Sequence, residues 1–137
     1  MTEETQPVRF ERPFAVATAD IDDLGHVNNV VYLRWVQDVA AAHWESATTP
    51  SERAEIGWVV LRHEIDYKHP AKLGDELIAR TWVGRPTAAT FERHTEIVRA
   101  ADQRLLARAR SLWCPVNPAT GRLRRIDPEL HDRFYAR

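Results

Sequence analysis

The sequence predicts an α+β fold in which one long helix is followed by an antiparallel sheet. Residues 30–44 form a long apolar segment directly after a turn rich in Asp, Asn and Gly, which is typical of a capped helix. Residues 58–69 alternate between apolar and polar side chains, which is typical of a half-exposed antiparallel strand. Further strand-like segments follow at hairpin spacing. A curved sheet of about five strands that wraps around a central helix accommodates this order.

The elements are expected in a simple order along the chain. They are a first strand over 10–17, the long helix, strands over 58–69, 76–83, 90–98 and 105–116, and a short final helix over 128–135. The helix has a broad apolar arc, which favours extensive burial. Its remaining stripe consists of Arg34, Gln37, Asp38 and Ala41, with Val30 among them. The polar segment 45–55 ends the helix, because Pro50 cannot continue it.

The strand over 58–69 is predicted to present Val59, Leu61, His63, Ile65 and Tyr67 on one face. A sheet wrapped around a single helix leaves an edge strand unpaired, and such edges pair with other chains. We therefore expect a homodimer, which a second pairing would double to a homotetramer.

Length and composition restrict the function classes. With 137 residues, the chain is expected to form one domain over 1–137, with residues 1–7 disordered. The net charge of -1 does not favour a nucleic-acid or membrane partner. The acidic N-terminus lacks the apolar run of a signal peptide, and no apolar segment reaches the ~18 residues of a membrane helix. The single cysteine, Cys114, excludes an internal disulfide and is expected to be a buried thiol in a cytoplasmic protein.

The candidate active site is the stretch Asp20-Ile21-Asp22-Asp23-Leu24-Gly25-His26-Val27-Asn28-Asn29. Its Asp, Asn and Gly residues favour turns and helix N-caps. The first N–H groups of a helix have no intrahelical partner and carry partial positive charge. A carboxylate beside such donors can attack a carbonyl, or activate water against it, while the donors hold the developing oxyanion.

This stretch resembles a known family. The pattern Asp20-x-Asp22-x-x-Gly25-His26-Val27-Asn28-Asn29-x-x-Tyr32 is similar to the motif of hotdog-fold thioesterases of the 4-hydroxybenzoyl-CoA thioesterase type. The second block of that family is matched by His63-Glu64-Ile65-Asp66-Tyr67-x-x-Pro70-Ala71-x-x-Gly74-Asp75-Glu76-Leu77. Both blocks occur in order, and with the strands that follow, the resemblance covers most of the chain. It implies a hotdog fold with an active site at a dimer interface.

The resemblance assigns roles to residues of the loop. Asp22 corresponds to the catalytic carboxylate, and the backbone amide of Asn29 would polarise the thioester carbonyl. Gly25 would permit the turn, and Asn28 would cap the helix near the substrate. His26 would contact the thioester, orient Asp22 or only close the turn. From spacing alone, a turn-forming or capping role for Asp22 is favoured, and the motif match reverses that preference.

Four aromatic or imidazole side chains complete the predicted substrate-binding set: Tyr32, Trp58, His63 and Tyr67. His63 and Tyr67 lie on the apolar face of one strand, where packing in a core or an interface is the more common role. Trp58 begins that strand, where it would border an acyl pocket or pack in the core.

Several other chemistries are disfavoured. The three serines, Ser46, Ser51 and Ser111, are in no Gly-x-Ser-x-Gly motif, and the acidic loop lacks the spacing of a calcium loop. The His-Val-Asn-Asn run is also similar to plant acyl-carrier-protein thioesterases, but their Asn two residues after the acid is replaced by Leu24. Hotdog hydratases and dehydratases carry Asp-x-Asn-x-x-His, or a His with a separate acid. Here three residues, not four, separate Asp22 from His26.

The sequence therefore predicts a thioesterase that acts on acyl-CoA, or on acyl-carrier protein, without a cofactor or a metal. The acyl group is left open. The competing hypothesis from another class is a hotdog module that binds acyl-CoA without turnover.

Overall fold

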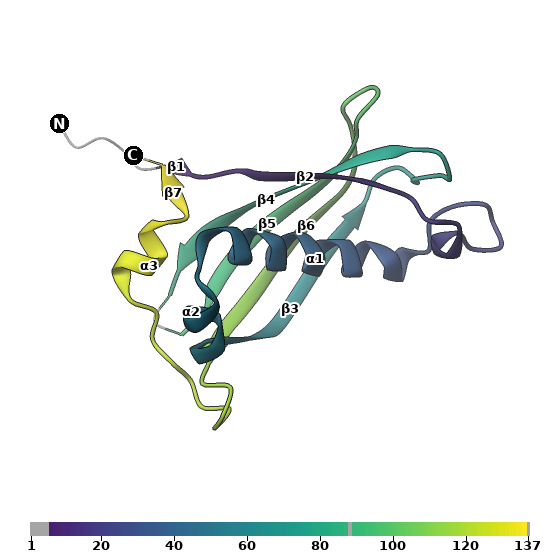
Figure 1. Ribbon diagram of the computed structural model, residues 1–137. Helices are drawn as coiled ribbons and strands as arrows, with labels where there is room; N and C mark the ends of the chain where they lie inside the picture. The colour runs from purple at the N-terminus through teal and green to yellow at the C-terminus, as the bar shows by residue number, and fades with distance from the viewer. Residues whose placement is uncertain (1–5, 88, 137) are drawn as a thin grey trace.

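The computed structural model describes residues 6–87 and 89–136, which form a long helix packed against a five-stranded antiparallel sheet (Figure 1). The elements are β1 (Gln6–Pro7), β2 (Phe10–Ala15), the 3-10 helix η1 (Thr18–Asp20), α1 (Asn29–Ala47), α2 (Pro50–Glu55), β3 (Gly57–Tyr67), β4 (Glu76–Pro86), β5 (Phe91–Arg99), β6 (Arg104–Val116), α3 (Pro128–Asp132) and β7 (Tyr135–Ala136). The strand order of the sheet is β2-β4-β5-β6-β3. The predicted architecture is confirmed.

Helix α1 crosses one face of the sheet, and its apolar side forms the core together with the inward residues of the strands (Figure 1). The core cluster consists of Val16, Val27, Val31, Tyr32, Trp35, Val39, Ala71, Leu77, Ala79, Ile97, Leu106 and Ala107. The opposite side of α1 is exposed at Val30, Arg34, Gln37, Asp38 and Ala41, which is the predicted stripe. No helix within the described ranges is long and apolar enough to cross a membrane.

A β-bulge changes the predicted faces of β3. Val60 pairs with Trp113 of β6 and Arg62 pairs with Leu112, so Leu61 has no partner in the register. An extra residue reverses the alternation of side chains between the two faces. The prediction that Val59, Leu61 and His63 share one face is therefore wrong: Val59 and Leu61 are 47% and 57% exposed, whereas His63 is half-buried.

The chain ends and the segment after α1 also differ from the prediction. Residues 1–5, predicted as disordered, lie outside the described residues, and Gln6–Pro7 pair with Tyr135–Ala136 as a two-stranded sheet. Pro50 ends no helix but begins α2, because the first turn needs no N–H donor from it. Thr49 and Glu52 form a reciprocal capping box at this helix start, with hydrogen bonds of 3.3 and 2.9 Å.

Candidate active site

The acidic loop folds as a tight hairpin at the N-terminal end of α1 (Figure 1). Ile21 and Val27 form an antiparallel bridge, and the Asp22 N–H donates to the His26 carbonyl at 2.8 Å. At the tip, the Gly25 N–H donates to the Asp22 carbonyl at 3.0 Å, and Gly25 has a φ of +77°. A left-handed conformation favours glycine, as the sequence predicts for this position.

Asp20 anchors the hairpin to the helix. It is 4% exposed, and its carboxylate accepts hydrogen bonds from Arg34 of α1 at 2.7 Å and from the Ala17 N–H at 3.0 Å. Its carbonyl accepts from the Asn28 N–H at 2.9 Å. The hydrogen bond to Asp20 raises the pKa of Arg34. All of these bonds are internal to the protein, so the first carboxylate of the Asp-x-Asp pair is structural.

Asp22 has a different environment. Its side chain is half-buried, and Oδ1 accepts hydrogen bonds from the Leu24 N–H at 2.9 Å and the His26 N–H at 3.3 Å. Within the described residues Oδ2 has no donor. The carboxylate is thus held by its own loop through one oxygen, while the other oxygen is free to act on a substrate. His26, also half-buried, contributes its backbone to this arrangement.

The start of α1 carries the second part of the predicted site. Asn28 is the N-cap, and its side chain accepts from the Val30 N–H at 3.0 Å. Asn29 is the first helical residue and is exposed, and its N–H has no acceptor within the described part of the chain. Its carbonyl accepts from the Tyr67 hydroxyl at 3.1 Å. The helix start therefore has an available donor near Tyr67, at the same end of α1 as Asp22.

Two of the other predicted residues lie inside the fold. Tyr32 is 2% exposed, its hydroxyl accepts from the Ala71 N–H at 2.9 Å, and burial raises its pKa. Tyr32 thus has little surface to offer a substrate. His63 bonds Ser111 through Nδ1 at 2.7 Å, packs edge-to-face on Trp113, and has its pKa lowered by burial. These contacts favour a packing role for His63, which is one of the two roles that the sequence predicts for it.

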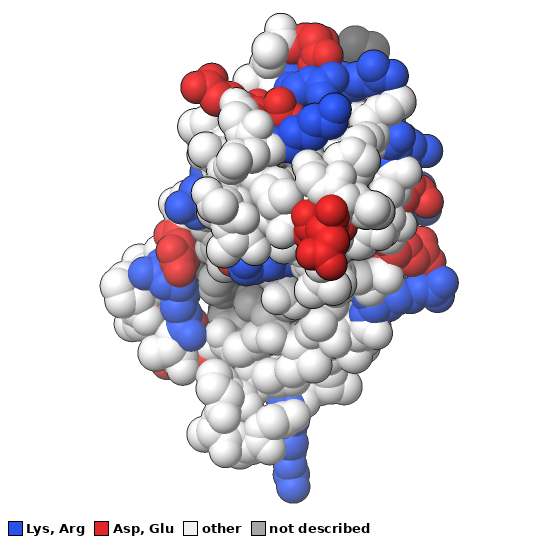
Figure 2. Space-filling model, turned by 90° about the vertical axis from the view of Figure 1, so that its right-hand side faces the viewer, with Lys and Arg blue, Asp and Glu red and all other residues white. Residues whose placement is uncertain are grey.

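The surface at this end carries charges of both signs. Figure 2 shows this face of the molecule: acidic and basic side chains are interspersed in its upper part and at its sides, an acidic patch lies near the middle, and the lower part is mostly uncharged. The pattern agrees with the net charge of -1. The face shown has no large region of a single charge sign that would attract a polyanion or a membrane.

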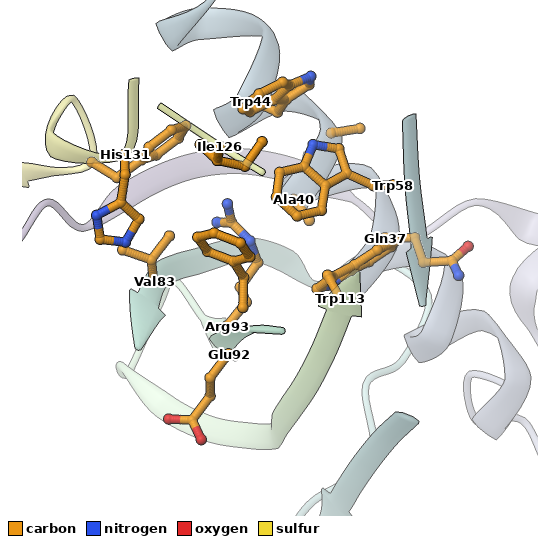
Figure 3. Close-up of a pocket in the computed structure, with 13 residues that line it drawn as sticks. Gln37, Ala40, Trp44, Trp58, Val83, Glu92, Arg93, Trp113, Ile126 and His131 are labelled. Atoms are coloured by element: carbon orange, nitrogen blue, oxygen red, sulfur yellow. The ribbon is translucent and has the colours of Figure 1, made fainter. Parts of the chain in front are cut away.

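Trp58 lies in the wall of a cavity of about 180 Å³ beneath the C-terminal half of α1 (Figure 3). The lining residues come from α1, α3, the segments on either side of α3 and four strands: Gln37, Ala40, Ala41, Trp44, Trp58, Val83, Phe91, Glu92, Arg93, Trp113, Ile126, His131 and Phe134. Most of this lining is aromatic or aliphatic. Such a cavity is suited to an apolar ligand group.

The structure thus divides the predicted residues between two places. Asp22, Gly25, His26, Asn28, Asn29 and Tyr67 lie at the N-terminal end of α1, whereas Trp58 lines the cavity and His63 contacts its wall through Trp113. Sequence reasoning missed Arg93 and His131 in that lining. A signal for Arg93 was present in the sequence. Arg93 shares the inward face of β5 with Phe91, Thr95 and Ile97, because these residues occupy every second position of the strand.

Comparison with known proteins agrees with this geometry. Residues 16–134 match the family model of the Thioesterase-like superfamily. Over 119 residues the chain is 29% identical to oleoyl-acyl carrier protein thioesterase 2, chloroplastic, of Arabidopsis thaliana. This match covers 85% of the chain but 32% of the plant protein, so the chain spans about a third of the length of that relative.

Solved structures share the fold. A 1,4-dihydroxy-2-naphthoyl-CoA thioesterase from Synechocystis is 20% identical with a TM-score of 0.80, over 93% of this chain and 96% of that one. A Staphylococcus aureus protein in complex with CoA is 16% identical with a TM-score of 0.83, over 96% and 85% of the two chains. A Thermus thermophilus thioesterase complexed with coenzyme A and Zn is 22% identical with a TM-score of 0.79, over 90% of each.

The family match is to the superfamily, and the narrower resemblance to 4-hydroxybenzoyl-CoA thioesterases stays a prediction. Because that match covers most of the chain, and the helix and sheet have the arrangement of the solved thioesterases, the chain belongs to the thioesterase-like superfamily and has the hotdog fold.

Proposed function

We propose that the protein hydrolyses acyl-CoA thioesters to a free acid and coenzyme A, with Asp22 as the catalytic carboxylate. The observation that carries this proposal is the environment of Asp22. Loop N–H groups fix Oδ1, and Oδ2 is without a donor in the described chain, next to a helix start. The exposed Asn29 N–H supplies the oxyanion donor. The family motif at Asp22, of the 4-hydroxybenzoyl-CoA thioesterase type, supports the same assignment.

Two mechanisms use this carboxylate. As a nucleophile, Oδ2 attacks the thioester carbonyl, the carbon–sulfur bond breaks, and the thiolate leaves and takes a proton from water. Water then hydrolyses the mixed anhydride to the free acid and regenerates Asp22. As a general base, Asp22 removes a proton from water as the water attacks the carbonyl. The carbon–sulfur bond then breaks, and the proton held by Asp22 passes to the leaving thiolate. Neither mechanism requires a cofactor or a metal ion.

The relatives support a coenzyme A thioester as the substrate class. The Synechocystis protein acts on an aryl-CoA, and two of the solved relatives hold coenzyme A. The plant relative acts on acyl carrier protein, which makes acyl-carrier-protein thioesters the second candidate. The two substrate classes share the thioester and the phosphopantetheine arm, so the same loop chemistry serves both.

The proposal includes assembly into a homodimer or homotetramer. β3 is an edge strand of the five-stranded sheet, and its exposed side chains include Val59, Leu61 and Tyr67. An unpaired edge of this length with exposed apolar residues favours pairing with a second copy. Tyr67 also bonds Asn29, so such a pairing would bring the partner close to the helix start. A cytoplasmic location stays a prediction from the single, buried cysteine.

The test is release of free thiol from a panel of aromatic and aliphatic acyl-CoAs by wild-type protein, Asp22→Asn and Asp23→Asn. Asn keeps an oxygen for the loop N–H groups of Asp22 but loses the carboxylate chemistry. We expect kcat/KM to fall ~100-fold or more in Asp22→Asn. Asp23 is an exposed neighbour, and its variant is expected to retain activity within about twofold.

Three results would contradict the proposal. Equal turnover by Asp22→Asn and the wild type would remove the carboxylate mechanism. An absence of thiol release, with an acyl-CoA still raising the melting temperature, would identify a binding module. Hydration of an enoyl-CoA without thiol release would identify a hydratase.

A further inference from the structure

The cavity beneath α1 contains a cation without a counterion. Arg93, in the central strand β5, is 9% exposed. Its Nη1 donates to His43 Nδ1 at 2.9 Å and to Thr81 Oγ1 at 3.2 Å. Within the described residues, Nη2 and Nε have no acceptor and no carboxylate pairs with Arg93. A buried charge without a partner is destabilising, because it has lost its hydration and gained no compensating ion.

The groups around Arg93 do not neutralise it. Burial lowers its pKa to about 10, so the guanidinium is protonated at neutral pH. Burial, with the nearby charge of Arg93, lowers the pKa of His43 to about 4, so that imidazole is neutral and acts as an acceptor. Glu92 lines the same cavity, but its carboxylate binds Arg110 and His94 at 2.7 Å each. Figure 3 shows the Glu92 carboxylate pointing away from the cavity.

Two further polar atoms in this lining are unpartnered. Trp113 Nε1 and His131 Nε2 are buried and have no hydrogen-bond partner within the described chain. Trp113 Nε1 is a donor only. Buried polar atoms are almost always paired in folded proteins, so the protein itself leaves the polar groups of this lining incompletely satisfied.

Arg93 faces the cavity from the floor that β5 forms. Phe91 also lines the cavity, and Arg93 is two residues further along β5 and therefore on the same face. Figure 3 shows the Arg93 side chain rising from β5 into the space between His131 and Trp58. The cation thus lies within an otherwise largely apolar lining.

We infer that the cavity receives the far end of the acyl group, and that this end carries a carboxylate. The inference rests on the proposed thioesterase function and specifies its substrate class. The aromatic and aliphatic walls hold the apolar body of the acyl group. The terminal carboxylate accepts from Arg93 and so supplies the counterion that the protein itself lacks.

The dimensions set the length of such a substrate. Arg93 bonds His43 of α1, which at the helical rise lies about 21 Å from Asn29. An extended chain advances roughly 1.2 Å per bond, so about seventeen bonds cover this distance. We therefore expect acyl chains of roughly fourteen to eighteen carbons with a carboxylate at the end.

The experiment compares matched pairs of acyl-CoAs that differ only at the far end: tetradecanoyl with tetradecanedioyl, hexadecanoyl with hexadecanedioyl, and octadecanoyl with octadecanedioyl. For the wild type, kcat/KM is expected to be at least about tenfold higher for the carboxylate-ended member of the best pair. Arg93→Met, which keeps an apolar chain of similar length, should remove or reverse this preference. The control Arg108→Met alters an arginine bound to Glu96 outside the cavity, and the preference should be retained.

Two further measurements keep the test decisive. If Arg93→Met does not fold, Arg93→Gln, which keeps an N–H donor for His43 and Thr81 but removes the charge, should lower the preference by several fold. The rise in melting temperature that octanoate causes in each protein, compared with the rise that octanol causes, reports on the cavity without catalysis. Only octanoate offers a carboxylate. Arg93→Met should abolish the difference.

The outcomes separate the two proposals. Equal kcat/KM for both members of every pair, or a carboxylate preference unchanged in Arg93→Met, or in Arg93→Gln where Arg93→Met does not fold, would overturn the inference and leave the thioesterase function standing. No thiol release from any pair, with octanoate still preferred over octanol through Arg93, would overturn the thioesterase function and retain a carboxylate site.

Discussion

The two ends of α1 differ in what surrounds their polar groups. At the N-terminal end, the carboxylates of the loop accept hydrogen bonds from N–H groups of the same loop, and Asn29, whose N–H has no acceptor in the described chain, is an exposed residue. At the other end, the buried Arg93 presents donors to a largely apolar cavity. A free donor in water costs little, whereas a buried one costs about 1–3 kcal/mol. The polar groups of the loop therefore need no ligand, whereas the buried donors of the cavity lack an acceptor without one.

The two ends of α1 are therefore suited to different tasks, the proposed chemistry at the exposed end and substrate recognition at the buried end. The exposed end holds the carboxylate that the proposed chemistry requires, and the same loop stays folded between turnovers. The buried end contributes recognition, because its unpaired donors gain most from an acceptor when no water competes. Three predictions test this comparison, beginning with the buried end.

The largest expected effect concerns His43, which accepts the hydrogen bond from Arg93 and has a pKa of about 4. In the unfolded chain this imidazole binds a proton near pH 6.5, so between pH 6.5 and 4 the unfolded state holds more protons. The free energy of unfolding should therefore decrease as the pH falls through this range, by roughly 3 kcal/mol for this group. Urea denaturation at several pH values measures it.

His43→Gln should flatten this pH dependence, because the variant has no imidazole to titrate at this position. His69→Gln, at an exposed position, serves as the control and should keep the wild-type slope. A slope unchanged in His43→Gln would show that the buried imidazole is not a source of the acid sensitivity.

The next effect separates the two carboxylates of the loop. Asp20→Asn removes the charge that binds Arg34 and places an amide beside the Ala17 N–H. Because hydrogen bonds to a charged group contribute about 1.5–3 kcal/mol, we expect the free energy of unfolding to fall by about 2 kcal/mol. Asp23→Asn should change it by less than about 0.5 kcal/mol. Equal urea midpoints for the two variants would contradict the anchoring role of Asp20.

Local patterns were sufficient for most of the fold. The alternation in β3 to β6 and the apolar arc of α1 are properties of neighbouring residues, and so is the acidic loop with its cap at Asn28. The bulge at Leu61 was not predictable in this way, because it depends on the register between β3 and β6. Likewise, Gln6–Pro7 became a strand only through pairing with the other end of the chain.

The acidic loop and the cavity also differ in how far the local sequence predicts them. The loop is one continuous stretch, so its residues and their order could be read directly from the sequence. The cavity combines α1, α3 and four strands, and its unpaired atoms are recognisable only once partners are known for every neighbour. A charged residue such as Arg93 at an inward position of β5 could be recognised as unusual from the sequence. The neighbouring sequence could not show that no carboxylate of the described chain pairs with it.

The smallest expected effect on stability compares two glycines at opposite ends of the molecule. Gly25 in the loop and Gly121 in the turn after β6 have φ of +77° and +70°, and a Cβ at either would meet no atom within 4 Å. Alanine should therefore cost about 1 kcal/mol at each position through backbone strain alone. Thiol release should fall by ~10-fold or more only in Gly25→Ala, because Gly25 shapes the turn that holds Asp22. Equal losses of activity in both variants would mean that strain in the loop is no more harmful to catalysis than strain elsewhere.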